Sequence, residues 1–323
     1  GLAAADKVLD SVDASLFGRV VLKSGNVYVT TNSFFAPSTT VASVARGLAT
    51  ASANDTLNIG TGAYTDSVVT VSTAGITANS EAGVSGFSFL LGTANTLTLA
   101  GAGDVNATGN ANANTLAGSA GINTLNGLAG ADNLTSNAGA DAVDGGTGID
   151  TANYAISYVS AITGSSTLSV DGDSVVNVEK LAFSDATVAI VGRGGSEYTT
   201  LNVAIAGTTT EKLWGVLAIN SSTFTTAGEL NALTARFVTT GSTITVDTTG
   251  MNSVQLAAVA GNSTTSAAVL PYPPVQVVSG STITGYFTTI QAGINFASDG
   301  DTINVAAGTF VLSSQLSIQK SLS

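Results

Sequence analysis

Cysteine and histidine are absent from the 323 residues of the chain, which holds one methionine and four prolines. Without cysteine there is no disulfide framework and no thiolate metal site. Without histidine or cysteine, Ser-His-Asp and Cys-His nucleophile systems are excluded, and zinc chemistry is close to excluded. The sequence also lacks an apolar run of about 18 residues, the length that crosses a membrane as a helix. These absences remove the classes of enzyme that depend on an imidazole or a thiol.

Positive charge is also scarce, and its distribution says more than the net charge of −12. Between Arg46 and Lys180 there is no lysine or arginine, whereas the same stretch holds eleven acidic residues. Ion pairs within this stretch cannot neutralise the carboxylates, so a cation from solution is the obvious candidate. The acidic balance argues against nucleic acid and anionic membranes as partners.

Small residues that suit strands and tight turns make up much of the rest of the chain. The sequence has 37 glycines, and 44% of its residues are hydrophobic, which makes disorder improbable despite the low complexity. Threonine, serine, valine, alanine and asparagine occur in short alternating stretches instead of long runs. This pattern predicts an all-β protein made of many short strands.

A nine-residue repeat occupies the acidic stretch. From Asn114 the chain divides into NTLAGSAGI, NTLNGLAGA, DNLTSNAGA and DAVDGGTGI, and Asp150 begins a fifth copy. The apolar column is Leu116, Leu125, Leu134 and Val143; the glycine column is Gly121, Gly130, Gly139 and Gly148; the first column is Asn114, Asn123, Asp132, Asp141 and Asp150. Columns that keep register over four copies indicate a repeating structural unit.

This repeat resembles that of the RTX family of secreted calcium-binding proteins, G-G-x-G-x-D-x-hydrophobic-x. The segment GGTGID at 145–150 matches the motif in full, whereas the copies that end at Asp132 and Asp141 lack one or both leading glycines. The copy that ends at Asn123 has lost the acid. Residues 151–191 are similar to the tail that follows such repeats, so the resemblance covers roughly a quarter of the chain.

The resemblance implies a parallel β-roll in which two nonapeptides form one turn and the apolar residues point inward. Glycine is needed in the turns because their backbone takes up positive φ. Asp132 and Asp150 are then expected to stack on one edge, and Asp141 to stack on Asn123 at the other. Calcium prefers six to eight oxygen ligands, which stacked turns can supply. The implied calcium ligands are Asn123, Gly130, Asp132, Gly139, Asp141, Asp144, Gly148 and Asp150.

The alternative is that these aspartates only form turns, which aspartate does well. Residues 95–114 keep the Thr/Asn/Leu/Gly texture with almost no acid, and we interpret them as solenoid turns without metal. Asp104 is the exception, and it lies out of register with the repeat.

A second, longer repeat relates residues 44–64 to residues 290–310 at a constant offset. Each copy begins with apolar residues at the spacing of a short amphipathic helix and continues through an Asp/Asn/Gly turn into an alternating strand. The phrase GDTINVAAGTF resembles the opening of pectate-lyase-like right-handed parallel β-helices, in which a helix caps the first coil. That likeness implies a fold and no activity.

The segment 192–272 is less regular. Thr226 is expected to cap a helix that carries Leu230, Leu233 and Phe237, and helix 253–260 and strand 243–246 are also expected. We place Trp214 in a core and not on a sugar-binding surface. The prolines near 271–274 indicate a linker.

The whole chain is expected to divide into five segments. They are 1–40, β-rich; 41–113, β-helix-like coils with a cap helix; 114–191, the RTX-like roll and tail; 192–272, a mixed module with the linker; and 273–323, the start of a second β-helix.

The predicted fold is therefore a parallel β-solenoid, a β-helix that runs into an RTX β-roll, with a smaller mixed β-rich module and short helices. The predicted function is that of a structural, self-assembling, secreted protein of the bacterial cell surface, an S-layer, sheath or adhesin component stabilised by Ca²⁺. Because the chain begins with Gly and carries no signal-peptide pattern, we expect a processed or excised segment.

Two other functions remain open at this point. A glycosidase needs only two carboxylates, whereas a polysaccharide lyase needs a cationic base beside calcium, which the acidic stretch lacks. A glycan-binding adhesin would need exposed aromatics, yet only 6% of residues are aromatic.

The expected partners are copies of the same chain or neighbouring modules, and cell-surface polysaccharide. The expected assembly edge comprises Ile303, Val305, Phe310, Leu316 and Ile318, because an incomplete coil cannot bury its apolar face alone.

Overall fold

A computed structural model describes residues 25–31, 42–158, 162–266, 275–287, 289–305 and 315–322. The chain divides into two compact units, Gly1–Glu197 and Tyr198–Ser323. The first unit is a parallel β-solenoid, as predicted, and the second combines short helices with two small sheets. No helix of the described ranges is both long and apolar enough to span a membrane.

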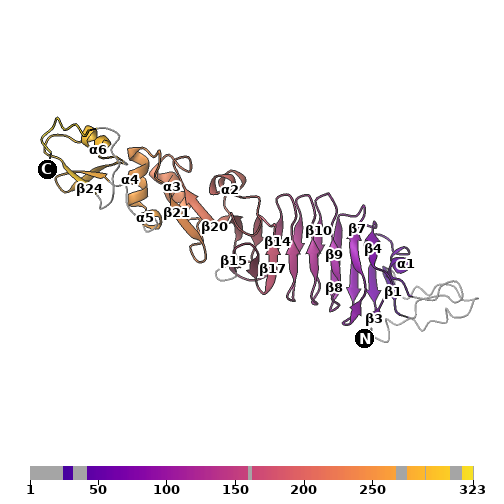
Figure 1. The fold of residues 1–323 in the computed structure, drawn as a ribbon. Coiled ribbons are helices and arrows are strands. Elements are labelled where there is room, and N and C mark those ends of the chain that lie inside the picture. The colour runs from indigo at the N-terminus through magenta and orange to yellow at the C-terminus, as the bar shows by residue number, and fades with distance from the viewer. Residues whose placement is uncertain are drawn as a thin grey trace, which may run out of the picture. The chain divides into compact units, whose positions relative to one another are not determined.

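Two sheets form opposite walls of the solenoid, and their strands lie side by side along it (Figure 1). The first sheet contains β1 (Asn26–Val29), β2 (Thr56–Ile59), β5 (Ile76–Ser80), β8 (Thr96–Gly101), β10 (Thr115–Ala117), β12 (Asn133–Thr135), β14 (Thr151–Asn153), β18 (Lys180–Ala182) and β19 (Thr187–Val191). The second contains β4 (Val68–Val71), β7 (Ser88–Leu91), β9 (Asn106–Thr108), β11 (Thr124–Asn126), β13 (Ala142–Asp144), β17 (Asp173–Val176), β16 (Leu168–Val170) and β15 (Ile162–Gly164). A small pair, β3 (Gly62–Ala63) and β6 (Val84–Ser85), lies apart from both.

The nonapeptides alternate between the two walls. In the first wall Leu116 pairs with Leu134, and in the second Leu125 pairs with Val143, so residues two repeats apart are neighbours. Each strand has three residues, and only the middle one points inward because side chains alternate along a strand. All four of these middle residues are at most 2% exposed. The register and the inward apolar column predicted from the repeat are therefore confirmed.

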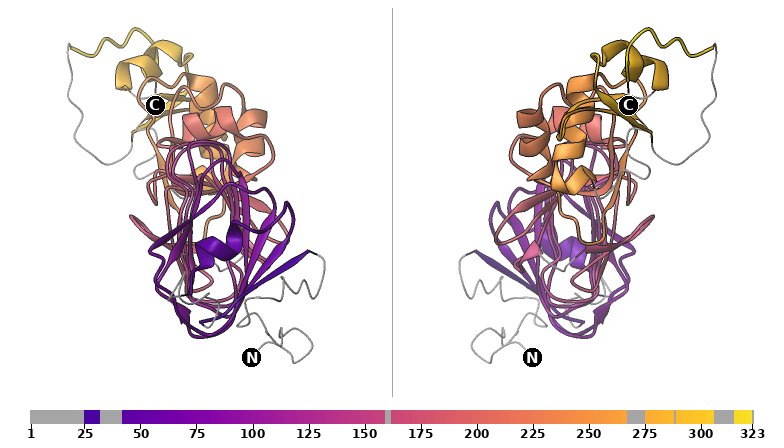
Figure 2. Two further views of the ribbon diagram at one scale, coloured as in Figure 1. Left: turned by 90° about the vertical axis from the view of Figure 1, so that its right-hand side faces the viewer. Right: turned by 90° about the vertical axis from the view of Figure 1, so that its left-hand side faces the viewer.

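The two ends of the solenoid are built differently. At the N-terminal end α1 (Val44–Leu48), capped by the Ser43 side chain, packs Val44 and Leu48 against the first coils, which superimpose when viewed along the stack (Figure 2). At the other end, β15 to β17 and the pair β18–β19 run antiparallel. The turn Asp171-Gly172 between β16 and β17 has positive φ at both residues, which suits a tight two-residue hairpin.

The second unit begins with a mixed α/β region. It contains α2 (Leu201–Gly207), β20 (Lys212–Ile219), α3 (Ala227–Thr234), β21 (Thr243–Val246), α4 (Ser253–Gly261) and α5 (Ser263–Ser266). β20 and β21 pair in parallel. Thr226 caps α3 in a capping box with Glu229, and Trp214 is 1% exposed with its Nε1 donating to the Thr240 carbonyl at 3.0 Å. The predicted cap, strand β21, helix α4 and core tryptophan are thus present. Phe237, expected on the helix, lies beyond the end of α3 and bridges Leu213 of β20, a strand that was not predicted.

A helix–turn–strand unit occurs twice, as the longer repeat predicted. α1 and β2 form the first copy, and α6 (Ile290–Phe296) and β24 (Thr302–Val305) form the second. In the first turn the Asp55 carboxylate accepts from the Ser52 N–H at 2.8 Å, and in the second Asp301 accepts from Ser298 at the same distance. The sequence repeat therefore corresponds to a repeated structure in which an aspartate side chain closes the turn between helix and strand.

The strands around the second copy do not form a solenoid coil in the described residues. β22 (Val275–Ser279) pairs antiparallel with both β23 (Thr282–Phe287) and β24, because the tight turn at Gly280, with φ of +63°, folds β23 back on β22. The strand expected at Leu316–Ile318 is absent. The Gln291 side chain bonds both the N–H and the carbonyl of Ser317, and it replaces a strand partner there. Phe310 lies outside the described residues.

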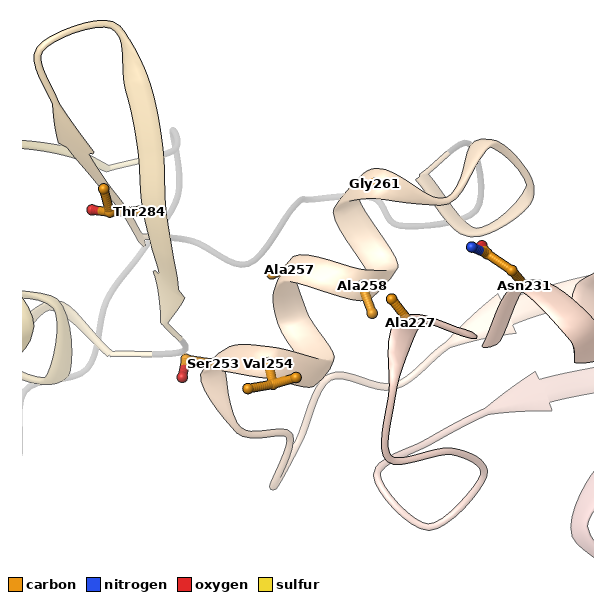
Figure 3. A pocket seen from close by; sticks show the side chains of 8 residues that line it. All are labelled: Ala227, Asn231, Ser253, Val254, Ala257, Ala258, Gly261 and Thr284. Atoms are coloured by element: carbon orange, nitrogen blue, oxygen red, sulfur yellow. The ribbon is translucent and has the colours of Figure 1, made fainter. Parts of the chain in front are cut away.

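The second unit also has a shallow hollow of about 450 Å³ beside α4 (Figure 3). Small side chains of α3 and α4 line it, and Thr284 of β23 stands opposite them. The lining residues are Ala227, Asn231, Ser253, Val254, Ala257, Ala258, Gly261 and Thr284. No titratable side chain lines this hollow, so it offers no acid–base chemistry.

Candidate metal centre

The first residue of alternate nonapeptides forms a ladder along one edge of the solenoid, which we call the first ladder. Its rungs are Asn114, Asp132, Asp150 and Glu179. The backbone N–H of each rung donates to a side-chain oxygen of the next: Asn114 to Asp132 Oδ1 at 2.7 Å, Asp132 to Asp150 Oδ1 at 2.7 Å, and Asp150 to Glu179 Oε2 at 2.8 Å. All four side chains are buried. The predicted stacking of Asp132 and Asp150 is confirmed.

The second ladder follows the opposite edge and consists of Asn123, Asp141 and Asp173. The Asn123 N–H donates to Asp141 Oδ1 at 2.7 Å, and the Asp141 N–H donates to Asp173 Oδ1 at 2.8 Å. These side chains are buried as well. Asp141 and Asn123 therefore stack as predicted, and the tail after the repeats supplies the last rung of each ladder.

The asparagine rungs satisfy their own side-chain polar groups. Asn114 Oδ1 accepts from the Asn110 N–H at 2.7 Å, and Asn123 Oδ1 accepts from the Ser119 N–H at 2.6 Å. The amide nitrogen of Asn123 donates to the Val105 carbonyl at 2.8 Å. A neutral rung with an amide donor of its own therefore needs nothing from solution.

The aspartate rungs are not satisfied in this way. The Oδ2 atoms of Asp132, Asp141 and Asp150 are buried and have no hydrogen-bond partner, although these side chains are 2%, 2% and 0% exposed. A buried carboxylate oxygen without a partner is costly, and native proteins leave few such groups. The three orphaned oxygens therefore require a positive ligand or a proton.

The backbone of the turns explains why these oxygens are left over. The residue four positions before each aspartate, Leu128, Asn137 or Gly146, has φ of +74°, +69° or +95°. The Leu128 N–H consequently turns to Asn126 Oδ1, at 3.0 Å, and not to Asp132. Asn110 and Ser119, the equivalent residues in the asparagine turns, do not have positive φ. In the turn before an asparagine rung, a backbone N–H donates to the rung side chain. In the turn before Asp132, the equivalent N–H donates elsewhere, so the carboxylate lacks this donor.

Glycine at the fifth position of the nonapeptide leaves room for several oxygens to meet. A Cβ on Gly127 would overlap both Asp132 Oδ2 and the carbonyl oxygen of Gly145 in the next turn. A Cβ on Gly145 would likewise overlap Asp150 Oδ2 and the Asn177 carbonyl oxygen. Carboxylate and carbonyl oxygens are the ligands that calcium prefers. Because no group of three or more acidic side chains meets at one point among the described residues, backbone carbonyls must complete any metal site.

The glycines predicted to take up positive φ do so. Gly130, Gly139 and Gly148 have φ of +121°, +136° and +128°. A side chain at these positions would meet the backbone carbonyl of the preceding turn, as for Gly148 against Gly130. These glycines are needed for backbone conformation and close approach, as the motif implied.

Substituting Gly127 by alanine is expected to weaken calcium binding and to lower the melting temperature of the solenoid unit. The methyl group would fill the space where Asp132 Oδ2 and the Gly145 carbonyl meet. Gly60→Ala is the control, because its nearest neighbour, a Thr30 methyl carbon, would stand at an ordinary 3.4 Å. Melting curves followed by circular dichroism, with and without calcium, make the comparison. Equal losses in the two variants would contradict the role given to Gly127.

Burial and neighbouring carboxylates favour the protonated form of these rungs. Burial raises the pKa of Asp150 to about 7, and the charges of Asp132 and Glu179 add to the rise. Burial raises the pKa of Asp141 to about 6, with a further contribution from Asp173. The pKa values of Asp132 and Glu179 are also raised, chiefly by burial.

These shifts predict opposite pH dependences for the calcium-free and calcium-bound protein. Since the folded pKa values exceed the unfolded ones, the calcium-free fold is most stable at acidic pH and loses stability as pH rises through about 7. Calcium needs deprotonated ligands, so its affinity should rise over the same interval. Thermal melting in chelator-treated buffer and calorimetric calcium titration between pH 5 and 8 measure both trends. A calcium affinity that does not change with pH would contradict the account.

Two predicted ligands, Asp144 and Asn123, differ from the three aspartates in having side chains that are hydrogen-bonded within the chain. Asp144 is half-buried on the outward side of β13, where the Asn177 amide donates to it at 2.8 Å. Asn123 belongs to the second ladder, but its oxygen and amide are already bonded within the chain. Asp104 accepts from the Ile122 N–H at 2.8 Å, one residue from the rung position, which agrees with its predicted loss of register.

Sequence reasoning missed the last rungs, Asp173 and Glu179. They follow Asp141 and Asp150 by 32 and 29 residues, whereas the regular rungs are 18 apart. A nonapeptide pattern cannot find residues beyond an insertion that changes the spacing. The only signal was their place among the unpaired acids of the acidic stretch.

Comparison with known protein families agrees with the geometry. Residues 99–125 and 117–152 match the model of the RTX calcium-binding nonapeptide repeat. The matched region contains the rungs Asn114 to Asp150 of both ladders. No curated protein and no solved structure matches the chain significantly. The repeats are RTX nonapeptides within a parallel β-solenoid, and calcium is the ion that such repeats bind.

Proposed function

We propose that the chain is a calcium-stabilised structural segment of a secreted protein. The observation that carries this proposal is the set of orphaned oxygens on Asp132, Asp141 and Asp150, which are buried in a region without lysine or arginine. Calcium supplies the missing positive charge and, unlike a proton, ties adjacent turns together. Its role is to stiffen the solenoid, and no reaction is assigned to it.

The residues that would hold calcium differ between the two edges. On the first ladder, Asp132 and Asp150 supply carboxylate oxygens, and Gly145 and Asn177 supply carbonyls beside them. On the second ladder Asp141 supplies the carboxylate. RTX-type repeats are typical of secreted proteins, where calcium near 10⁻³ M can saturate weak extracellular sites.

Calcium should therefore raise the melting temperature of the purified chain, whereas magnesium at equal concentration should have a much smaller effect. Magnesium demands a compact octahedral site and gives up its waters reluctantly, so a carbonyl-rich turn suits it poorly. Melting curves in calcium, magnesium and chelator provide the comparison. An unchanged melting temperature in millimolar calcium would rule out the stabilising role.

The burial of the ladder carboxylates supports a structural role over catalysis. A glycosidase needs two carboxylates that reach a bound sugar, yet Asp132, Asp141 and Asp150 are at most 2% exposed. A polysaccharide lyase needs a cationic base beside calcium. Pairing of β14 and β18 does bring Lys180 beside Thr151, but Lys180 lies on the outward side of the strand because Leu181 points inward.

We propose further that the protein assembles end to end at the bacterial surface, as an S-layer, sheath or adhesin component. Among the described strands β24 pairs with β22 alone, so it forms an edge of its sheet. Ile303 in β24 is half-buried, whereas Val305 and, outside the strands, Ile318 are 42% and 60% exposed. An edge strand with exposed apolar side chains favours pairing with another copy or a neighbouring module.

The double variant Val305→Lys and Ile318→Lys should reduce this association and leave the monomer folded, since both side chains are exposed. Val203→Lys on α2, at a side chain that is 46% exposed, is the matched control. Light scattering and electron microscopy of each variant report the size of the assemblies. Assemblies of wild-type size in the double variant would contradict the proposed edge.

A further inference from the structure

A buried group of oxygens lies where the second ladder meets the tail. It contains Asp141 Oδ2, Ser136 Oγ and the Tyr154 hydroxyl, and each of these three atoms is buried without a hydrogen-bond partner. The Tyr154 hydroxyl lies beside the side chains of Ser136 and Asp173, and the charges of Asp173 and Asp141 raise its pKa. Ser136, Asp141 and Asp173 are 2%, 2% and 3% exposed, and Tyr154 is 7% exposed.

Two of these residues depart from the repeat. Ser136 occupies the fifth position of its nonapeptide, which is glycine at Gly118, Gly127 and Gly145. At Gly127 and Gly145 that position faces the orphaned oxygen of the aspartate five residues later. Ser136 therefore adds a hydroxyl where the other turns have only space. Tyr154 takes the same position in the copy that Asp150 begins, 18 residues after Ser136.

The carboxylates of this group accept hydrogen bonds from neutral backbone N–H groups. Asp141 and Asp173 are joined only through the Asp141 N–H, which donates to Asp173 Oδ1. The sequence between Arg46 and Lys180 contains no lysine or arginine. Burial, together with Asp173, raises the pKa of Tyr154 above its usual range, so the hydroxyl is a neutral oxygen donor. Two buried carboxylates and two neutral hydroxyls form a donor set for a hard divalent cation.

We propose that Ser136, Asp141, Tyr154 and Asp173 form a separate calcium site that joins the repeats to the tail. This inference rests on the proposed calcium binding and adds ligands that the nonapeptide motif does not contain. Because Asp173 belongs to β17 in the tail, the site ties the antiparallel end of the solenoid to the regular turns. It differs from the sites of the first ladder in using side-chain hydroxyls.

Terbium, which replaces calcium at oxygen sites and luminesces when a nearby tyrosine is excited, tests the proposal in the full chain. Tyr154→Phe should remove the part of the tyrosine-sensitised signal that calcium displaces. It should also weaken one class of calcium site by about tenfold or more in calorimetry, the scale of losing a supporting contact at a metal centre. Tyr158→Phe makes the same chemical change at a residue outside the group, and it should leave both readouts at wild-type values.

Ser136→Gly provides a second variant, because it restores the residue found in the other turns. It should weaken the same class of site while the calcium response of Asp132 and Asp150 persists. Wild-type terbium signal and calcium affinity in both Tyr154→Phe and Ser136→Gly would overturn the proposal, and would indicate a buried water only. Absence of calcium binding in the wild-type chain would instead overturn the proposed function itself.

Discussion

Replacing Asp132 and Asp150 together by alanine is expected to abolish most of the rise in melting temperature that calcium produces. The two residues are successive rungs of the first ladder, and their Oδ2 atoms are buried without partners. A ligand present at about 100 times its Kd stabilises the folded state by about 2.7 kcal/mol per site. For a unit of this size, 1 kcal/mol shifts the melting temperature by about 2–4 °C. The variant should therefore lose roughly 5–10 °C of the calcium response for each site removed.

Asp144→Asn is the control for this experiment. Asp144 lies on the outward side of β13 and accepts a hydrogen bond from the Asn177 amide, which an asparagine oxygen can accept equally well. The control should keep the wild-type calcium response. Melting curves of the three proteins, each with calcium and with chelator, give the result. A full calcium response in the Asp132→Ala, Asp150→Ala protein would show that calcium acts elsewhere.

Leu134→Ala is expected to destabilise the solenoid strongly, with or without calcium. Leu134 is fully buried, and its register partners in the wall are Leu116 and Ala152. Because Ala152 is already small, the neighbouring coil offers no side chain that could fill the space. Truncation of a buried leucine costs about 2–5 kcal/mol.

The matched control for Leu134→Ala is Ile122→Ala, since Ile122 belongs to the same repeat region and is 59% exposed. Its truncation should change stability by about 0.5 kcal/mol or less. Urea unfolding followed by circular dichroism measures both variants. Similar losses of stability in the two proteins would mean that the inward column is not the core of the solenoid.

The change from asparagine to aspartate along each ladder explains why only part of the solenoid is expected to bind calcium. Asn114 and Asn123 are bonded by turns that present an N–H to the side chain. At Asp132 the preceding turn has positive φ at Leu128 and withdraws that N–H. The upstream coils are therefore complete without metal, whereas the downstream coils depend on a cation or a proton. Calcium binding would therefore complete the folding of the downstream coils.

The regular part of the fold could be predicted because one physical rule governs it. A three-residue strand with one inward side chain and an 18-residue turn repeats without change, so Leu116, Leu134 and the stacked aspartates follow from spacing alone. The helix–turn–strand repeat could also be predicted from the sequence, because the turns at Asp55 and Asp301 are formed by residues close together in the chain.

The remaining features depend on contacts between distant residues. Asp173 and Glu179 join the ladders across an irregular insertion, which no fixed period describes. The Leu316–Ile318 segment has the alternation of a strand, but Gln291 bonds its backbone and prevents a ladder from forming. The antiparallel sheet of β22 to β24 pairs Val275–Ser279 with the distant Thr302–Val305. In each case a single tertiary contact overrides the local pattern.

Calorimetric titration of calcium into the chelated chain tests the central claim most directly. The wild-type protein should show saturable binding at millimolar calcium or below, because the Oδ2 atoms of Asp132, Asp141 and Asp150 are buried without hydrogen-bond partners and can coordinate a cation. The triple variant Asp132→Asn, Asp141→Asn, Asp150→Asn converts the three aspartate rungs of the repeats into the neutral rung found at Asn114 and Asn123, and should bind no calcium at these turns. Saturable binding of equal stoichiometry in the triple variant, or no binding in the wild type, would contradict the account.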